Sequence, residues 1–317
     1  MNRATYTMAP AAFWIITALV LCVYSPARAQ QDSQYTQYMY NTQTINPGYT
    51  ATREVPSFLG LYRAQWIGLD GAPRTFNFSG SMPLGERLGA GLSFTQDAIG
   101  ISDESTIVAD VSYRIPLNEE DLKFSFGVKG GINLLDVRFS ELIKYNPNDP
   151  QFQADIDNRL TPVIGAGAYL YTNRWYFGIS VPNFLTTTHY DDSAVSTAKE
   201  EMNFYGMAGY VFDIAQNTEL KPAVMVKAVD GAPLAIDVSA NMRFNRRFTL
   251  GAAYRLDAAV SGLAGFETNN GIMFGYSYDY GIQNLGNYNS GSHEVFIRFD
   301  LGLGQNAKEK MLTPRFF

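Results

Sequence analysis

Residues 272–280 decide the fold, and they read Ile272-Met273-Phe274-Gly275-Tyr276-Ser277-Tyr278-Asp279-Tyr280. Large apolar or aromatic side chains occupy every second position, while a methionine, a glycine, a serine and an aspartate stand between them. Because side chains alternate between the two faces of a β-strand, this pattern predicts a strand with one apolar face. Residues 248–255 and 294–301 alternate in the same way. The charged side chains on the face opposite the aliphatics include Arg255, Asp279, Arg298 and Asp300.

Similar alternation recurs from residue 57 to residue 301. The strands are about ten residues long, the length that a tilted strand needs to cross a bilayer, whereas strands of soluble sandwiches usually have five to six residues. We therefore predict an all-β fold, a transmembrane antiparallel β-barrel of about 14 strands. The expected strands are 57–68, 73–83, 87–96, 104–115, 121–134, 161–172, 174–183, 202–212, 218–228, 233–243, 247–256, 258–267, 270–280 and 293–302.

The connections between these strands differ in length in a regular way. If both ends of the barrel domain face the periplasm, every even-numbered connection is a short periplasmic turn. The three longest connections, 135–160, 183–201 and 281–292, are all odd-numbered and would be extracellular. Short periplasmic turns and long extracellular loops are typical of bacterial outer-membrane barrels. Aromatic residues near strand ends are expected to form the interface girdles, and these are Trp66, Tyr113, Tyr171, Trp175, Tyr210, Tyr254 and Tyr280.

The composition agrees with strands that have one apolar and one polar face. Hydrophobic residues make up 46% of the chain and aromatic residues 14%, yet the mean hydropathy is only -0.12. After the N-terminal segment no run of 18 consecutive apolar residues occurs, so helical membrane spans are not expected. The formal net charge is -6 and no basic block is present, which argues against nucleic acid as a partner.

The first 29 residues predict a cleaved signal peptide. Arg3 provides a basic start, residues 11–23 are almost wholly apolar, and Ala27 and Ala29 are small residues before the expected cleavage site. The alternative, a transmembrane anchor, is disfavoured because the apolar run has about 13 residues and a spanning helix needs about 20. Cys22, the only cysteine, lies within this segment, so the mature chain would contain none.

The remaining chain divides into three parts. Residues 30–56 are polar and rich in tyrosine, and we hypothesise that they fold into the barrel lumen as a plug, because a barrel of this size has a wide interior. Residues 57–302 are expected to form the barrel, and residues 303–317 a C-terminal tail. Glycines within 127–131 and 165–167 lie inside expected strands, where small residues let strands bend and twist.

No catalytic constellation is evident, and we expect neither an enzyme nor a cofactor or metal site. The two histidines, His189 and His293, lie in an expected outer loop and at a strand edge. Residues 146–150 and 155–158 form an acidic patch in an outer loop, which leaves a Ca²⁺ site as an alternative to a solvated loop. The patch lacks the glycine and the closing glutamate of an EF-hand, so the solvated loop is the preferred interpretation.

Several stretches, in order along the chain, resemble the PorP/SprF family of type IX secretion membrane proteins. They are residues 31–41, 45–49, 62–66, 71–75, 89–92, 292–294 and 314–317. The chain departs from the family pattern at Asp32-Ser33, where members tend to have Asp-Pro, and at Asn41-Thr42, where many have Asn-Pro. Neither difference falls within the expected barrel.

The resemblance implies a function in surface display. Family members resemble outer-membrane partners of very large secreted adhesins, such as those of gliding bacteria. They are thought to receive the C-terminal secretion domain of the adhesin and to hold it at the cell surface. The implied partners are therefore an adhesin, other type IX secretion components and outer-membrane lipid. An outer-membrane channel or hydrophobic-solute transporter remains the alternative, and an outer-membrane hydrolase is a weaker one.

Arg63, Gln65 and Trp66 are candidate partner-contact positions in the first expected strand. Under the functional interpretation they would contact the adhesin domain or the secretion machinery. Under the structural interpretation Trp66 is a girdle residue and Arg63 faces the lumen. The structural interpretation is favoured because a tryptophan at the membrane interface is expected in any barrel.

Overall fold

The computed structural model describes residues 34–50, 52–142, 154–185 and 202–302. The expected signal peptide, the C-terminal tail, His189 and residues 146–150 lie outside the described residues. The described helical elements are short: α2 (Thr42–Ile45), η1 (Pro47–Tyr49), η2 (Phe139–Glu141) and η4 (Asn284–Tyr288). None of the helices in these ranges is long and apolar enough to span a membrane.

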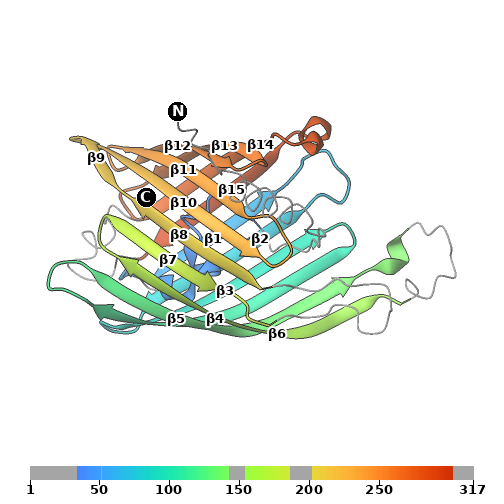
Figure 1. Ribbon diagram of the computed structural model, residues 1–317, viewed down its shortest axis with the longest axis horizontal. Coiled ribbons are helices and arrows are strands. Elements are labelled where there is room, and N and C mark those ends of the chain that lie inside the picture. The colour runs from blue at the N-terminus through green and yellow to red at the C-terminus, as the bar shows by residue number, and fades with distance from the viewer. Residues whose placement is uncertain (1–33, 51, 143–153, 186–201, 303–317) are drawn as a thin grey trace, which may run out of the picture.

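The strands follow one another along the chain in antiparallel pairs (Figure 1). They are β1 (Ser57–Ala64), β2 (Arg74–Pro83), β3 (Leu88–Ile99), β4 (Ser102–Pro116), β5 (Lys123–Val137), β6 (Ile156–Tyr171), β7 (Trp175–Val181), β8 (Asn203–Tyr210), β9 (Phe212–Ala215), β10 (Thr218–Val229), β11 (Ala235–Phe244), β12 (Phe248–Arg255), β13 (Ala259–Glu267), β14 (Ile272–Gly281) and β15 (Ser292–Asp300).

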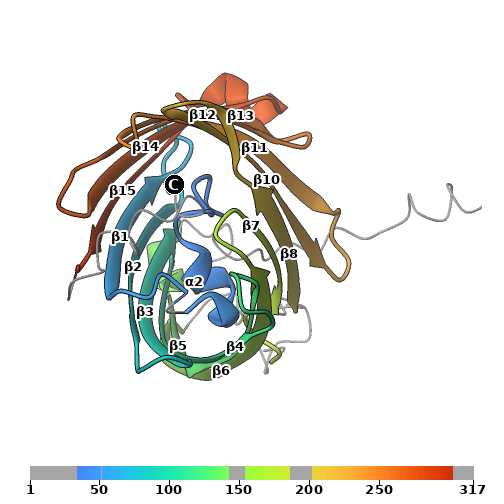
Figure 2. The same cartoon turned by 90° about the vertical axis from the view of Figure 1, so that its left-hand side faces the viewer.

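The sheet closes into a barrel because the first and last strands pair. β1 and β15 are antiparallel in a register that runs from Ser57 opposite Asp300 to Ala64 opposite His293. β8 and β9 both pair with β10 and are two segments of one strand, separated at Val211. The barrel therefore has 14 strands, as the sequence predicted. Figure 2 shows this closed ring from one end.

The predicted strand boundaries differ from the observed ones at several ends. β1 ends at Ala64 instead of residue 68, so Gln65 and Trp66 lie outside the strand in which they were expected. Two further differences have a clear cause. β6 begins at Ile156, five residues before its expected start, because its first residues pair with the end of β5. Residues 213–215 were expected in a turn, but they form most of β9, since a bulge at Thr218/Glu219 lets the pairing with β10 continue.

The apolar faces of the strands point outward, whereas those of a soluble β-sandwich point into the core. In β12 Phe248 and Leu250 are more than half exposed, whereas Thr249 between them is buried. The same inversion recurs around the ring, with exposed Leu92, Val128, Ile164 and Phe177 on other strands. Inward positions carry serines, asparagines and ionised side chains. An apolar outer surface around a polar interior is the pattern of a barrel that is surrounded by lipid.

The two rims of the barrel differ as the sequence predicted. The short-turn rim carries connections of two to six residues, namely 84–87, 117–122, 172–174, 216–217, 245–247 and 268–271. The long-loop rim carries the long connections 65–73, 138–155, 182–202 and 282–291. β4, β5 and β6, with 15, 15 and 16 residues, extend beyond the other strands at the long-loop rim (Figure 1).

Most of the expected girdle aromatics have exposed or half-exposed side chains, including Trp66, Tyr210, Tyr254 and Tyr280. Tyr171 is an exception, and its expected position at the membrane interface was wrong. It is 2% exposed and lies inside the barrel with Tyr169, to whose ring it packs at a centroid distance of 5.7 Å. Both residues occupy inward positions of β6, so alternation along the strand takes them away from lipid.

Candidate functional site

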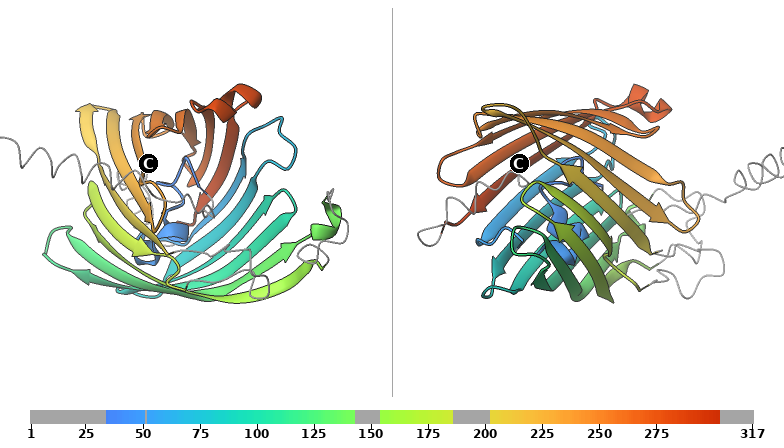
Figure 3. Two further views of the ribbon diagram at one scale, coloured as in Figure 1. Left: turned by 45° about the vertical axis from the view of Figure 1, so that its right-hand side comes forward. Right: turned by 60° about the vertical axis from the view of Figure 1, so that its left-hand side comes forward.

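The interior of the barrel is occupied by the chain's own residues 34–50 and 52–56, which we call the luminal segment. Figures 2 and 3 show this segment, in blue, enclosed by the strands, with α2 and η1 in its middle. Nearly all of its side chains are buried, and Asn46 is completely inaccessible. Its polar and aromatic composition suits a lumen whose walls are hydrogen-bonding groups, because buried polar atoms need partners.

The first anchor of the luminal segment is a buried ion cluster, which we call the seam cluster. Arg63 of β1 pairs with Asp279 of β14 at 2.7 Å and with Glu294 of β15 at 3.1 Å. The backbone N–H groups of Thr36 and Gln37 donate to the two oxygens of Glu294, at 3.0 and 2.8 Å. The Thr36 hydroxyl donates to Asp279 at 2.7 Å. The cluster thus ties the luminal segment to the strands that close the barrel.

A second anchor lies at the short-turn rim. Arg53 forms an ion pair with Asp300 at the end of β15, and the Ser57 hydroxyl donates to the same carboxylate at 2.6 Å. The neighbouring Glu54 accepts from Arg114 of β4 at 2.7 Å and from Lys123 of β5 at 2.6 Å. Residues 53 and 54 therefore reach both β15 and the β4–β5 hairpin across the mouth of the barrel.

Tyr40 illustrates how the segment fills the space between the anchors. Burial raises the pKa of Tyr40 to about 12, so its phenol stays neutral at physiological pH. Its ring packs on Phe296 at a centroid distance of 4.8 Å. The Lys221 ammonium lies 5.4 Å from the ring centre and the Arg298 guanidinium 5.9 Å from it. These cations, from β10 and β15, stabilise a neutral aromatic ring within a charged lumen.

Glycines on the barrel wall allow the luminal segment to approach the strands closely. A Cβ atom on Gly127 would lie 2.4 Å from the carbonyl of Pro47, and one on Gly167 would lie 2.1 Å from Oδ1 of Asn46. The sequence-based interpretation of these glycines, strand bending, was therefore incomplete. Strand bending is a better explanation for Gly131 and Gly165, because added Cβ atoms there would meet the backbone of neighbouring strand segments.

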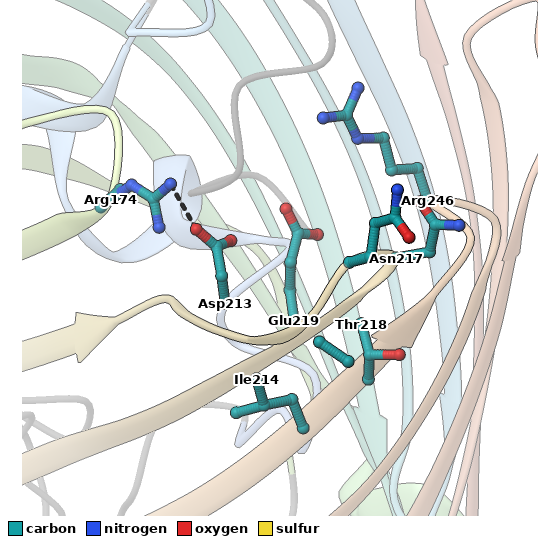
Figure 4. A pocket seen from close by; sticks show the side chains of 9 residues that line it. Arg174, Asp213, Ile214, Asn217, Thr218, Glu219 and Arg246 are labelled. Carbon is teal, nitrogen blue, oxygen red and sulfur yellow. Dashed lines mark ion pairs between the residues drawn. The ribbon is translucent and has the colours of Figure 1, made fainter.

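The barrel also has a charged pocket of about 480 Å³ at the short-turn rim (Figure 4). Arg174 and Asp213 pair across it at 2.6 Å, and Glu219 is held by Arg243 at 2.6 Å. Arg246 lines its other side. The residues that line it include no histidine, serine or cysteine, and Thr218 provides the one hydroxyl side chain among them.

The described ranges contain no group of three or more His, Cys, Asp or Glu side chains placed to hold a metal ion. Of the predicted acidic outer loop, residues 155–158 are described, and the placement of 156–158 in a loop was wrong because they begin β6. The Asp155 carboxylate accepts from the backbone N–H and the hydroxyl of Ser140, both at 2.7 Å. Its oxygens are thus used within the protein.

The model of one protein family, described as type IX secretion system membrane protein PorP/SprF, matches residues 27–299. The chain belongs to the PorP/SprF family. As a PorP/SprF protein it is a component of type IX secretion, and the family and the barrel fold place it in the outer membrane. No curated protein sequence matches the chain.

Solved structures similar to this PorP/SprF protein include outer-membrane barrels. The outer membrane protein Omp33 of Acinetobacter baumannii has a TM-score of 0.46 and 9% identity over 79% of this chain and 100% of its own. A deletion mutant of TodX, a monoaromatic hydrocarbon channel, has 0.47 and 11% over 80% and 91%. A FadL homologue of Pseudomonas aeruginosa has 0.45 and 11% over 86% and 96%.

The three candidate contact residues of this PorP/SprF protein do not form one site. Arg63 points into the lumen and is 2% exposed, within the seam cluster. The half-buried Gln65 donates its backbone N–H to the carbonyl of Pro73. Trp66 lies at the long-loop rim with 38% exposure and a φ of 47°, a left-handed conformation that is rare for bulky residues.

Sequence reasoning missed the acidic and luminal members of the seam cluster in this PorP/SprF protein. Asp279 had been placed on the inward face of its strand, and Glu294 stood on the face that also carries Arg298. That alternation was the available signal. It could not reveal that Thr36 would meet both carboxylates, because these residues lie 243 and 258 positions away in the chain.

Proposed function

We propose that this PorP/SprF protein anchors a large secreted adhesin at the cell surface by binding the adhesin's C-terminal domain, and that it has no enzymatic activity. The observation that supports anchoring is the occupied lumen. The luminal segment is held at one end by hydrogen bonds from Thr36 and Gln37 to Glu294 and at the other by the buried ion pair of Arg53 with Asp300, so the interior is used for internal contacts. A partner outside the cell would then bind the long-loop rim, since loops on a rigid scaffold carry recognition.

The best-supported contact surface on this rim consists of two adjacent loops, 65–73 and 282–291. Ile67 donates its N–H to the carbonyl of Gly291, and Ser290 donates to the carbonyl of Ile67, which extends the β1–β15 pairing into the loops. Trp66, Ile67 and Tyr288 expose large side chains there, and Tyr288 is 75% exposed. The longer loops 138–155 and 182–202 share this rim and are proposed to complete the binding surface.

Replacing Trp66→Ala is expected to weaken adhesin capture at least tenfold, because exposed aromatic residues contribute strongly to protein interfaces. The measurement is recovery of the adhesin from detergent-solubilised outer membrane on tagged barrel. Tyr210→Ala is the matched control, since Tyr210 is similarly exposed but belongs to the opposite end of the barrel. Equal recovery by both variants would exclude Trp66 from the interface, and failure of the wild-type barrel to recover any large surface protein would refute the anchoring function.

The alternative function, a channel for hydrophobic solutes, receives less support. Such a channel needs an apolar path, whereas the inward side chains include Lys129, Lys221, Lys227 and Arg298. Two of these cations, Lys221 and Arg298, lie against Tyr40 of the luminal segment. The alternative predicts that the intact protein conducts in planar bilayers.

A further inference from the structure

Asn46 sits in a seat formed by two strands of the barrel wall. Its side-chain amide donates to the carbonyls of Ala168 on β6, at 3.1 Å, and of Ile179 on β7, at 3.2 Å. These two residues are cross-strand partners in the β6–β7 ladder. The side-chain oxygen of Asn46 accepts from the N–H of Gly48 at 2.9 Å. The two contacts with the barrel wall depend on an amide, because aspartate has no N–H group to donate to the two carbonyls.

Three glycines form the wall around this seat, which we call the glycine cradle. Gly127 of β5 and Gly167 of β6 are cross-strand partners, and Gly178 of β7 lies beside them. A Cβ on any of them would come within 3.0 Å of Asn46 or Pro47. The fit is reciprocal, since a Cβ on Gly48 of the luminal segment would lie 3.0 Å from the carbonyl oxygen of Gly167. The cradle therefore accommodates only a peptide backbone that packs closely against these glycines.

An aromatic wall completes the site. The ring of Tyr49 meets Tyr169 edge-on, with a centroid distance of 5.5 Å and an interplanar angle of 85°. Tyr169 in turn stacks on Tyr176 at 5.5 Å and 14°. Edge-to-face and stacked pairs of this kind contribute favourably beyond simple burial. This aromatic wall therefore favours an aromatic residue two positions after the proline.

From these contacts we propose that the glycine cradle is a peptide-binding site with specificity for the sequence Asn-Pro-Gly-Tyr. Residues 46–49 of the luminal segment are its intramolecular ligand. The recognising contacts all come from four consecutive residues, and the two ionic anchors of the segment lie elsewhere, at Glu294 and Asp300. Recognition is therefore local, and the cradle accepts the same tetrapeptide when a separate chain supplies it.

Intramolecular binding normally excludes such a peptide, because the tethered copy has a high effective concentration. A full-length barrel with Asn46→Ser, Pro47→Ser and Tyr49→Ser removes the tethered ligand's contacts. A fluorescent synthetic peptide of residues 42–50 is expected to bind this variant saturably, as measured by anisotropy, and to bind the wild-type barrel at least tenfold more weakly. A peptide with Asn46→Asp should bind the variant at least tenfold more weakly than the native peptide.

Adding Gly167→Val to the same barrel should abolish binding of the peptide, since the new side chain occupies the place of the Asn46 carboxamide. Binding that survives Gly167→Val would overturn the proposal. Equal binding of the Asn46→Asp peptide, or saturable binding of neither peptide to a folded variant, would do so as well.

A second experiment leaves residues 46–49 intact and uses single substitutions. Gly127→Val is expected to expel η1 from the cradle and to speed amide hydrogen exchange of residues 42–50 at least tenfold, because a Cβ at Gly127 meets the Pro47 carbonyl. Gly130→Val on the same strand is the matched control, since an added Cβ there has no atom within 4 Å. Unchanged exchange in Gly127→Val, or the same increase in Gly130→Val, would contradict the proposed recognition.

Discussion

Deletion of residues 31–50 is expected to raise the single-channel conductance of this barrel in planar bilayers at least tenfold. A ring of 14 strands encloses an interior wide enough to conduct unless it is filled. In the intact protein the luminal segment occupies that interior and is hydrogen-bonded to its walls. Its removal leaves a lumen lined by ionised and hydroxyl side chains, which water and ions can enter.

The deletion variant must first be shown to keep its barrel, for which far-ultraviolet circular dichroism and heat-dependent electrophoretic migration are suitable. Val128→Ala, which changes an outward-facing side chain of β5, is the control for effects of substitution on insertion. Equal conductance of the intact protein and the deletion variant would contradict the hypothesis that residues 30–56 act as a plug. High conductance of the intact barrel would favour the channel function instead.

Replacing Glu294→Ala is expected to destabilise the barrel by about 3–5 kcal/mol, because the buried N–H groups of Thr36 and Gln37 lose their acceptor and Arg63 loses one of its two carboxylate partners. Glu294 is fully buried, pairs with Arg63 and accepts the N–H groups of Thr36 and Gln37. Its loss weakens both the contact between β1 and β15 and the first anchor of the luminal segment. The measurement is the midpoint of urea unfolding in detergent or lipid.

Glu141→Ala is the matched control for this prediction. Glu141 pairs with Arg138 at 3.2 Å, but both side chains are about half exposed. A pair of this kind is expected to contribute less than about 1 kcal/mol. Equal effects of Glu294→Ala and Glu141→Ala would show that the seam cluster does not stabilise the closed barrel.

Local patterns in the sequence were sufficient for the barrel itself. The alternation in residues 272–280 correctly separated the outward Phe274 and Tyr276 from the inward Ser277 and Asp279. Repetition of that pattern predicted the strand number, and the turn lengths predicted the two different rims. These features are readable because the side chains of a strand alternate with a period of two, whatever lies across the barrel.

Individual positions whose surroundings come from distant parts of the chain could not be predicted. Tyr171 was expected among the girdle aromatics because it lies at the end of a strand, yet its inward orientation places it inside the lumen. Gly127 and Gly167 were interpreted through their own strands, although what they accommodate is Pro47 and Asn46. Their neighbours are about 80 or more positions away in the sequence, so no local pattern contains them.

The sequence by itself therefore determined the class of fold, the strands, the unequal rims and the resemblance to PorP/SprF proteins. Only the tertiary structure decided how residues 34–56 are placed and held. Strand alternation is a property of successive residues, but the seam cluster and the glycine cradle exist only after the barrel has closed. Closure of the barrel brings Thr36 next to Glu294, which lies 258 positions away in the chain. A buried charge must have a partner, and that partner is determined by which groups the closed barrel places beside it.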